Sequence, residues 1–430
     1  MKKGLTLLLF AMISTSAVPS SAADHRYDLL LEGGHVIDAR NELSAVRDVA
    51  IVDGRVAAVA PKIDPAEALK VVDVAGLYVT PGLVDLHTHV YTGTGEKGSY
   101  AGDNSVYPDG HTLRVGVTTV VDAGGSGWRN FEDFKDRIID RSKTRVLAFL
   151  NIIGGGMRGL EHEQDLADME PEPAAEMALQ HKETIVGIKT AHYGERDWGP
   201  VERAVEAGAK ANLPVMVDFG DDFPERPLAE LVTEKLRAGD IYTHVYSGRR
   251  GELGPDGHVN PGLVAGRKHG VIFDVGHGGG SFFWRVAVPM VKEGFWPDSI
   301  STDLHINSMN SGMKDQLNVM SKFLALGMTL DDVVGRSTWN PAREIGREEL
   351  GHLSVGALAD VAVLRLESGR FGFIDAYGAR LDGTQKLTCE LTLRDGKVAY
   401  DLNGISREAW DTLPAGYEMT GDPRWDGIWR

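Results

Sequence analysis

The chain has 430 residues, a formal net charge of −17 and a hydrophobic share of 42%. A surface this acidic repels nucleic acid and anionic lipid, which argues against partners of either kind and leaves a small-molecule substrate and a homo-oligomer as the open choices. Cys389 is the single cysteine, so an intrachain disulfide is excluded and stability must come from a large apolar core.

The first 23 residues have the features of a secretory signal peptide. Lys2 and Lys3 form a basic start, an apolar run follows from Leu5 to Ile13, and Ala22-Ala23 offers small residues for cleavage. The apolar run is too short for a membrane span, and no later segment is long and apolar enough to be one. We therefore expect a secreted protein, periplasmic if the source is a bacterium with two membranes. The alternative is an unstructured amino terminus.

Both ends of the remaining chain are rich in short strands. Residues 24–80 and residues 345–400 each contain apolar stretches and an Asp-Gly hairpin turn. These two blocks predict one small β-sandwich domain that is built from both chain ends. The tail over residues 401–430 is predicted to pack back on the protein or on a second subunit, because it carries Trp410, Trp425 and Trp429.

The middle of the chain, residues 81–344, alternates apolar strands with helical segments. Eight strands are expected, at residues 83–86, 118–122, 146–152, 185–189, 214–219, 241–246, 271–275 and 299–303. Helical periodicity is present between several of them, over residues 200–211, 228–238 and 315–326. Strand–helix units of this number and length predict an α/β fold, a TIM-type (β/α)8 barrel. A doubly wound open sheet is the alternative, although no glycine-rich phosphate loop follows the first strand.

The sequence His87-Thr88-His89 stands at the end of the first barrel strand. Because strand side chains alternate, both imidazoles point to one face, where neutral histidines are good ligands for a divalent metal ion. In a TIM-type barrel the chemistry lies at the carboxyl ends of the strands. Five more polar residues are expected at the ends of later strands, namely Lys189, Asp218, His244, His277 and Asp303. The sequence therefore predicts a metal site on this rim.

The order of His-x-His, lysine, histidine and aspartate around eight strands resembles the amidohydrolase superfamily. The segment Tyr78-Val79-Thr80-Pro81-Gly82-Leu83-Val84-Asp85-Leu86-His87 is similar to it as well. Segments 116–124, 273–278 and 338–342 resemble the deacetylase-like branch, which is related to dihydroorotases and D-aminoacylases. The resemblance covers roughly residues 28–400. It implies a metallohydrolase that uses an activated water molecule to cleave an amide or ester acyl bond.

The resemblance also implies the metal ligands. His87 and His89 would hold the more buried ion together with Asp303, and His244 would hold a second ion. Lys189 would be carboxylated by carbon dioxide so that its carbamate bridges the two ions, because an unmodified lysine is a cation and cannot ligate. The metal would be one or two zinc ions, with manganese or iron as alternatives.

The chain departs from the family at the fifth strand, where histidine is usual and Asp218 stands instead. Asp218 is predicted to bind the second ion, since zinc accepts carboxylate oxygen. Otherwise the second site is weak or empty and the centre is mononuclear. An ionised Asp218 makes the cluster less positive, which should make metal-bound water less acidic. Carboxylate is also a harder ligand, which favours manganese or iron at the second site.

Catalytic and substrate-binding residues are expected on the same rim. Asp303 can accept the proton of the attacking water, and His277 or His192 can stabilise the oxyanion together with a metal ion. The expected substrate-binding residues are His192, Tyr193, Tyr246, Arg249, Arg250 and His305. N-acyl amino acids or acylated hydroxy acids fit this site, and a lactone or cyclic amide is the alternative. A non-catalytic binding protein that keeps the barrel is the alternative of another class, to which only Asp218 points.

Overall fold

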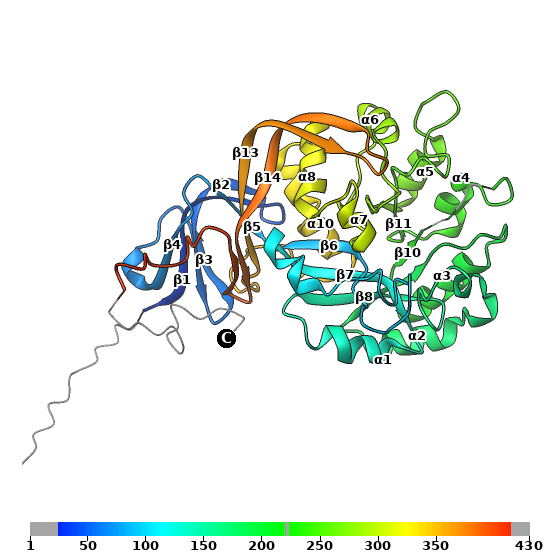
Figure 1. Cartoon of the computed structure of the whole chain (residues 1–430), viewed down its shortest axis with the longest axis horizontal. Coiled ribbons are helices and arrows are strands. Elements are labelled where there is room, and N and C mark those ends of the chain that lie inside the picture. The colour runs from blue at the N-terminus through cyan, green and yellow to red at the C-terminus, as the bar shows by residue number, and fades with distance from the viewer. Residues whose placement is uncertain (1–24, 219, 221–222, 414–430) are drawn as a thin grey trace, which may run out of the picture.

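The computed structural model describes residues 25–218, 220 and 223–413, which form a barrel and a separate sheet (Figure 1). The predicted signal peptide over residues 1–23 lies outside the described residues, as do Trp425 and Trp429 of the predicted tail. Trp410 is described and is 78% exposed, so this tryptophan does not pack on its own chain. In the described part of the chain, no helix has the length and apolar character needed to cross a membrane.

The separate sheet is assembled from both chain ends, as the sequence predicts. Its order is β15-β14-β13-β5-β1-β2-β3, with β4 paired to β1. The strands are β1 (Tyr27–Asp38), β2 (Leu43–Val52), β3 (Arg55–Ala60), β4 (Ala68–Asp73), β5 (Tyr78–Pro81), β13 (Val361–Ile374), β14 (Arg380–Arg394) and β15 (Lys397–Asp401). The pairing of β5 with β13 joins the two ends, with Thr80 opposite Ala362. Leu29 and Leu31 enter one apolar cluster and Leu30 another, because successive side chains point to opposite faces.

The barrel contains a curled parallel sheet of order β12-β11-β10-β9-β8-β7-β6. Its strands are β6 (Leu83–Thr88), β7 (Val117–Gly127), β8 (Arg145–Asn151), β9 (Ile185–Thr190), β10 (Val215–Val217), β11 (Ile241–Tyr242) and β12 (Ile272–Phe273). An extended segment connects its two edges, since Ser299 bridges Asp274 and Leu304 bridges Thr88. The predicted eighth strand is thus an extended segment with isolated bridges, and the predicted barrel class is confirmed.

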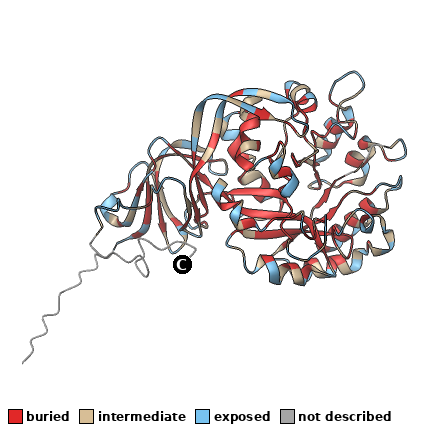
Figure 2. Cartoon of the chain, viewed as in Figure 1, coloured by how far each residue is buried: buried red, intermediate tan, exposed pale blue. Residues whose placement is uncertain are grey.

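Helices lie around the barrel strands (Figure 1). They are α1 (Phe131–Phe134), α2 (Pro171–Gln180), α3 (Gly199–Ala211), α4 (Leu228–Glu230), α5 (Pro261–His269), α6 (Trp284–Lys292), α7 (Ile306–Asn310), α8 (Gln316–Ala325), α9 (Leu330–Gly335) and α10 (Trp339–Glu344). α3 and α8 agree with the predicted helices, whereas the helix predicted over 228–238 is α4 followed by a π-helical turn over Leu231–Lys235. The strands that they surround are buried, as Figure 2 shows.

The hairpin of β13 and β14 differs from the predicted sandwich. Its far half leaves the separate sheet and passes across α8 to α6 (Figure 1). The backbone N–H of Leu387 donates to Ser321 Oγ on α8 at 3.0 Å, and Trp284 Nε1 on α6 donates to the Phe373 carbonyl at 3.1 Å. Part of the predicted 345–400 block therefore packs against the barrel, because β13 and β14, of 14 and 15 residues, extend beyond the separate sheet.

Candidate metal centre

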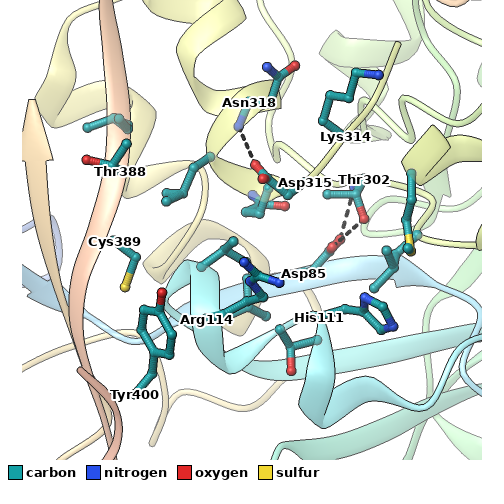
Figure 3. Close-up of a pocket in the computed structure, with 18 of the residues that line it drawn as sticks. Asp85, His111, Arg114, Thr302, Lys314, Asp315, Asn318, Thr388, Cys389 and Tyr400 are labelled. Atoms are coloured by element: carbon teal, nitrogen blue, oxygen red, sulfur yellow. Dashed lines mark hydrogen bonds between the residues drawn. The ribbon is translucent and has the colours of Figure 1, made fainter. Parts of the chain in front are cut away.

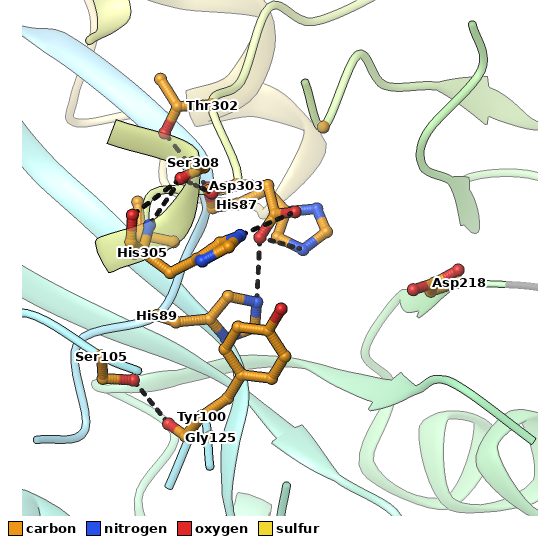
Figure 4. Close-up of polar contacts among 12 residues, drawn as sticks. His87, His89, Tyr100, Ser105, Gly125, Asp218, Thr302, Asp303, His305 and Ser308 are labelled. Carbon is orange, nitrogen blue, oxygen red and sulfur yellow. Dashed lines mark hydrogen bonds and ion pairs between the residues drawn. The ribbon is translucent and has the colours of Figure 1, made fainter. Parts of the chain in front are cut away.

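Three predicted ligands meet at the carboxyl end of the barrel strands. His87 lies in β6, His89 follows it, and Asp303 belongs to the extended segment beside β6. Asp303 Oδ1 lies 3.1 Å from His89 Nε2 and 3.8 Å from His87 Nε2 (Figure 4). Among the described residues, this is the group whose metal-ligating atoms all lie within 4.8 Å of one another. The three atoms converge on one point at the rim.

Hydrogen bonds behind the cluster fix the tautomer of His87. Thr243 Oγ1 donates to Asp274 Oδ2 at 2.7 Å, so its oxygen accepts from His87 Nδ1 at 3.0 Å. With its hydrogen on Nδ1, the ring presents the lone pair of Nε2 to Asp303. His244 is oriented in the same way, because its Nδ1 donates to the Gly276 carbonyl. Such partners set the orientation and basicity of a metal-ligating imidazole.

The donor set fits a divalent ion. Asp303 Oδ1, His89 Nδ1 and His305 Nδ1 are buried and have no hydrogen-bond partner among the described residues. Burial and the nearby Lys189 hold the pKa of His87 well below its usual value, so the ring is neutral. Burial opposes ionisation of Asp303, yet His305, His87 and His89 outweigh it and hold its pKa well below the usual range. Neutral imidazoles and an anionic carboxylate are ligands that zinc accepts.

Lys189 lies near the carboxyl end of β9, next to the same cluster. Its Nζ lies 3.5 Å from His87 Nε2, and the residue is fully buried. Burial is the main cause that lowers the pKa of its amine. A Cβ on Gly124 would come 2.7 Å from Lys189 Cγ, so glycine at this position of positive φ makes room for the lysine stem.

Asp218 follows β10 and contacts three basic side chains. Its Oδ1 accepts a hydrogen bond from Arg250 Nη2, while Oδ2 lies 3.2 Å from His192 Nε2 and 3.4 Å from His244 Nε2. Burial raises its pKa, but Arg250, His244 and His192 outweigh burial and hold the pKa well below the usual range. Asp218 is therefore ionised and already paired with groups of its own chain.

His192 joins Asp218 to a second buried carboxylate. Its Nδ1 lies 2.7 Å from Glu163 Oε2, and Glu163 is 1% exposed. Burial lowers the pKa of His192, but Glu163 and Asp218 outweigh burial and raise it to about 10. His192, His244 and Asp303 all have a positive φ, of 56°, 63° and 53°. Such strained residues persist where the surrounding structure holds them, often at functional sites.

The remaining predicted rim residues separate into two groups. His305 lies beside the cluster, with Nε2 3.9 Å from Asp303 Oδ2. The side chains of the others are bound to other protein groups: Tyr193 to Asp197, Tyr246 to the Phe295 carbonyl, Arg249 to Tyr377, and Arg250 to Asp218 and the Gly220 carbonyl. These four residues are thus engaged in the described structure, and their substrate contacts stay predictions.

His277 is buried after β12, but its ring nitrogens face protein groups. Nε2 lies 2.6 Å from Lys322 Nζ on α8, and Nδ1 lies 2.9 Å from the Gly278 carbonyl. The ring stacks on Phe282 with centroids 4.6 Å apart. Its predicted role as an oxyanion donor stays a prediction, and it would require His277 to exchange one of these partners.

Tyr100 is a rim residue that the sequence did not reveal. Its ring centroid lies 4.3 Å from that of His89, 5.1 Å from His305 and 6.0 Å from His192 (Figure 4). Burial is the first cause that raises the pKa of its phenol, and Asp303 and Asp218 add to it. The residue belongs to a loop without periodicity, so no signal in the sequence distinguishes it.

A cavity of about 420 Å³ lies behind the cluster, between α7, α8 and β14 (Figure 3). Asp85 and Thr302 form part of its wall, and Asp85 accepts from the backbone N–H of Thr302 at 3.0 Å and of His87 at 3.3 Å. Burial raises the pKa of Asp85 to about 7. Asp85 thus connects β6, which carries His87, to the segment that carries Asp303.

Known proteins resemble this chain in sequence and structure. A model of the amidohydrolase family matches residues 284–399. A deacetylase of Brucella anthropi is 33% identical over 334 residues, which are 76% of this chain and 81% of the relative. A deacetylase of Enterococcus faecalis is 27% identical over 383 residues, 87% of this chain and 99% of the relative.

Two solved structures are similar to this chain in fold and in sequence. An adenine deaminase superimposes with a TM-score of 0.80 at 27% identity, covering 87% of this chain and 100% of that chain. A dihydroorotase superimposes with a TM-score of 0.75 at 29% identity, covering 86% of this chain and 98% of that chain.

Proposed function

We propose that this protein is a metal-dependent deacylase of small N-acyl amino acids. The chain belongs to the amidohydrolase family and is a hydrolase acting on carbon–nitrogen bonds. The observation that carries the proposal is the cluster of His87, His89 and Asp303, in which the buried Oδ1 of Asp303 has no hydrogen bond. The relatives named deacetylase support an acyl-amide substrate. Acylated hydroxy acids present the same carbonyl chemistry.

This donor set supports the proposed metal dependence. When bound, a divalent ion supplies Lewis-acid polarisation and lowers the pKa of a water molecule. His87 Nε2, His89 Nε2 and Asp303 Oδ1 would hold that ion. Zinc suits two imidazoles and a carboxylate, and manganese or iron are the alternatives.

Asp303 Oδ2 is the group that moves the proton. It accepts the proton of the attacking water and passes it to the leaving nitrogen, as a general base and then a general acid. A Cβ at position 278 would come 2.4 Å from this oxygen, so Gly278, with φ of +57°, leaves room there. His305 Nε2 lies 3.9 Å from this oxygen.

Tyr100 can donate a hydrogen bond to the carbonyl oxygen under attack. Its ring lies among those of His89, His192 and His305. Because its pKa is raised, the phenol keeps its proton over the working pH range. A donor aimed at the developing oxyanion stabilises the transition state more than the substrate.

Carboxylation of Lys189 belongs to the same proposal. A buried amine of lowered pKa is neutral more often, and the neutral Nζ bonds to the carbon of carbon dioxide with loss of one proton. The resulting carbamate is an anion next to His87, suited to complete the ligand set. We expect Lys189→Ala to lose bound metal and activity, with partial rescue by short carboxylic acids. Lys386→Ala, at a lysine paired with Glu367, is the control that keeps both.

The decisive experiment is a substrate panel before and after metal removal. N-acetyl amino acids, acylated hydroxy acids, lactones and phosphotriesters are offered to protein that has been treated with a chelator and then reloaded with zinc, manganese or iron. We expect release of the free amino acid that vanishes with the metal and returns on reloading. Hydrolysis that survives the chelator unchanged would contradict metal dependence. A protein that binds metal but cleaves nothing in the panel would favour the non-catalytic alternative.

A cyclic amide is the second candidate substrate class. A dihydroorotase of Ruminiclostridium cellulolyticum is 50% identical over 62 residues, which are 14% of this chain. Ring opening uses the same attack on a carbonyl carbon and the same proton transfer to nitrogen. Adding a hydantoin and a dihydropyrimidine to the panel separates the two classes.

We also propose export, which predicts a mature amino terminus near Ala23 or Asp24.

A further inference from the structure

The end of the rim at β10 does not fit a second metal ion. Asp218 would have to be a ligand there, yet its Oδ1 accepts from Arg250 and its Oδ2 lies 3.2 Å from His192 Nε2. His244 Nε2 lies 3.4 Å from the same Oδ2. Both oxygens of this carboxylate are thus directed at nitrogen atoms of the chain. An ion would have to displace them before it could bind.

Arg250 is held in place by more than Asp218. Its Nε donates to the Gly220 carbonyl at 2.6 Å, and its backbone N–H donates to Glu252 Oε2 at 3.0 Å. The residue is 5% exposed, so the guanidinium cannot turn into solvent without a rearrangement of its surroundings. Removing one partner of such a buried pair leaves a charge without compensation. The pair therefore resists exchange of the arginine for a metal ion.

His192 offers no lone pair to a metal in this arrangement. Its Nδ1 faces Glu163 Oε2 at 2.7 Å, and its Nε2 faces Asp218 Oδ2. Each ring nitrogen therefore has a carboxylate oxygen as its neighbour and is directed at that oxygen, away from a metal position. His192, Asp218 and His244 also fail to form a compact ligand group. In the described part of the chain, that property belongs to His87, His89 and Asp303.

Resting on the proposed function, we infer that this enzyme works with a single metal ion, held by His87, His89 and Asp303. Arg250 is then a positioning residue, because its guanidinium supplies the positive charge beside Asp218 that a second metal ion would otherwise supply. Asp218 and Glu163 then hold His192 between them. The His192 ring stacks toward Tyr100, with centroids 6.0 Å apart, so the network fixes the wall of the site at the end of β10.

Metal stoichiometry tests the inference on the full-length protein. The holoenzyme is saturated with zinc, freed of unbound metal by gel filtration and measured by mass spectrometry of the metal. One ion per chain supports the inference. Two ions per chain overturn it and leave the proposed function standing, whereas no bound ion overturns both. Asp218→Asn is expected to keep the ion and its affinity, and loss of an ion in this variant would overturn the inference as well.

The role of Arg250 has its own readout. Arg250→Gln removes the positive partner of Asp218, so we expect the thermal midpoint to fall and excess zinc to restore part of it. Arg249→Gln is the matched control, because Arg249 is exposed and its side chain donates to the Tyr377 hydroxyl, so this variant should show neither effect. Arg250→Lys keeps the charge and should keep most of the stability. An Arg250→Gln variant that zinc does not stabilise, or a control that responds equally, would overturn the role. If Arg250→Gln does not fold, the ion count of Asp218→Asn decides.

Discussion

Two buried aspartates stand at opposite sides of the same rim and have different neighbours. Asp303 lies among imidazoles, with Oδ1 free of hydrogen bonds and close to two Nε2 atoms. Asp218 lies against Arg250 and against His192, whose other nitrogen is bound to Glu163. Both carboxylates have a pKa held well below the usual range, but by different groups. The comparison indicates that Asp303 is available to a metal ion, whereas Asp218 is already paired with a cation of its own chain.

The largest expected effect is a difference in kcat/KM between variants of these two aspartates. Asp303→Asn removes the charge that holds the metal and the base that moves the proton, so we expect kcat/KM to fall by about 10³-fold or more. Asp218→Asn should lower it far less, because the residue acts through His192. The measurement is steady-state kinetics on the best substrate of the panel, with metal content determined in parallel. Equal losses in the two variants would erase the distinction.

Stability should differ sharply between the neighbouring arginines. Arg250→Gln breaks a buried ion pair, which typically costs about 3–5 kcal/mol of unfolding free energy. Arg249 is exposed, and Arg249→Gln should stay within about 0.5 kcal/mol of the parent chain. Urea unfolding followed by circular dichroism gives both values. A loss below about 1 kcal/mol for Arg250→Gln would mean that Asp218 finds another partner.

Tyr100→Phe tests whether the Tyr100 hydroxyl donates a hydrogen bond to the substrate carbonyl oxygen. The change removes one hydroxyl and keeps the ring stacked on His89 and His192, so folding and metal content should not change. Loss of one oxyanion donor costs about 10²–10³-fold in kcat, and we expect the lower part of that range with KM little altered. An unchanged kcat would show that the hydroxyl points away from the reacting carbonyl.

The barrel and its first ligands could be predicted from local patterns in the sequence. The positions of His87 and His89 follow from strand alternation after an apolar run, and that of Asp303 from its place at the end of the last expected strand. The ion pair of Asp218 with Arg250 could not be predicted, because the residues are 32 positions apart on separate loops and each alone fits several roles. The long hairpin was missed for a related reason, since Glu367–Phe371 in β13 is largely exposed and shows no buried face.

The smallest expected effect is a pH dependence of stability that involves His192. Its pKa is raised to about 10 in the folded chain, compared with about 6.5 when unfolded, so the folded state binds more protons between these values. The stabilisation is therefore complete below about pH 6.5 and is lost as the pH rises toward 10. His192→Gln keeps an N–H donor but cannot titrate. We expect the difference in unfolding free energy between the parent chain and this variant to shrink steadily from pH 6 to 10, as measured by urea unfolding at constant ionic strength. A metal ion at Asp218 would displace the Nε2 hydrogen and abolish this dependence. A difference that stays flat over the range would therefore contradict the cationic network and favour Asp218 as a ligand.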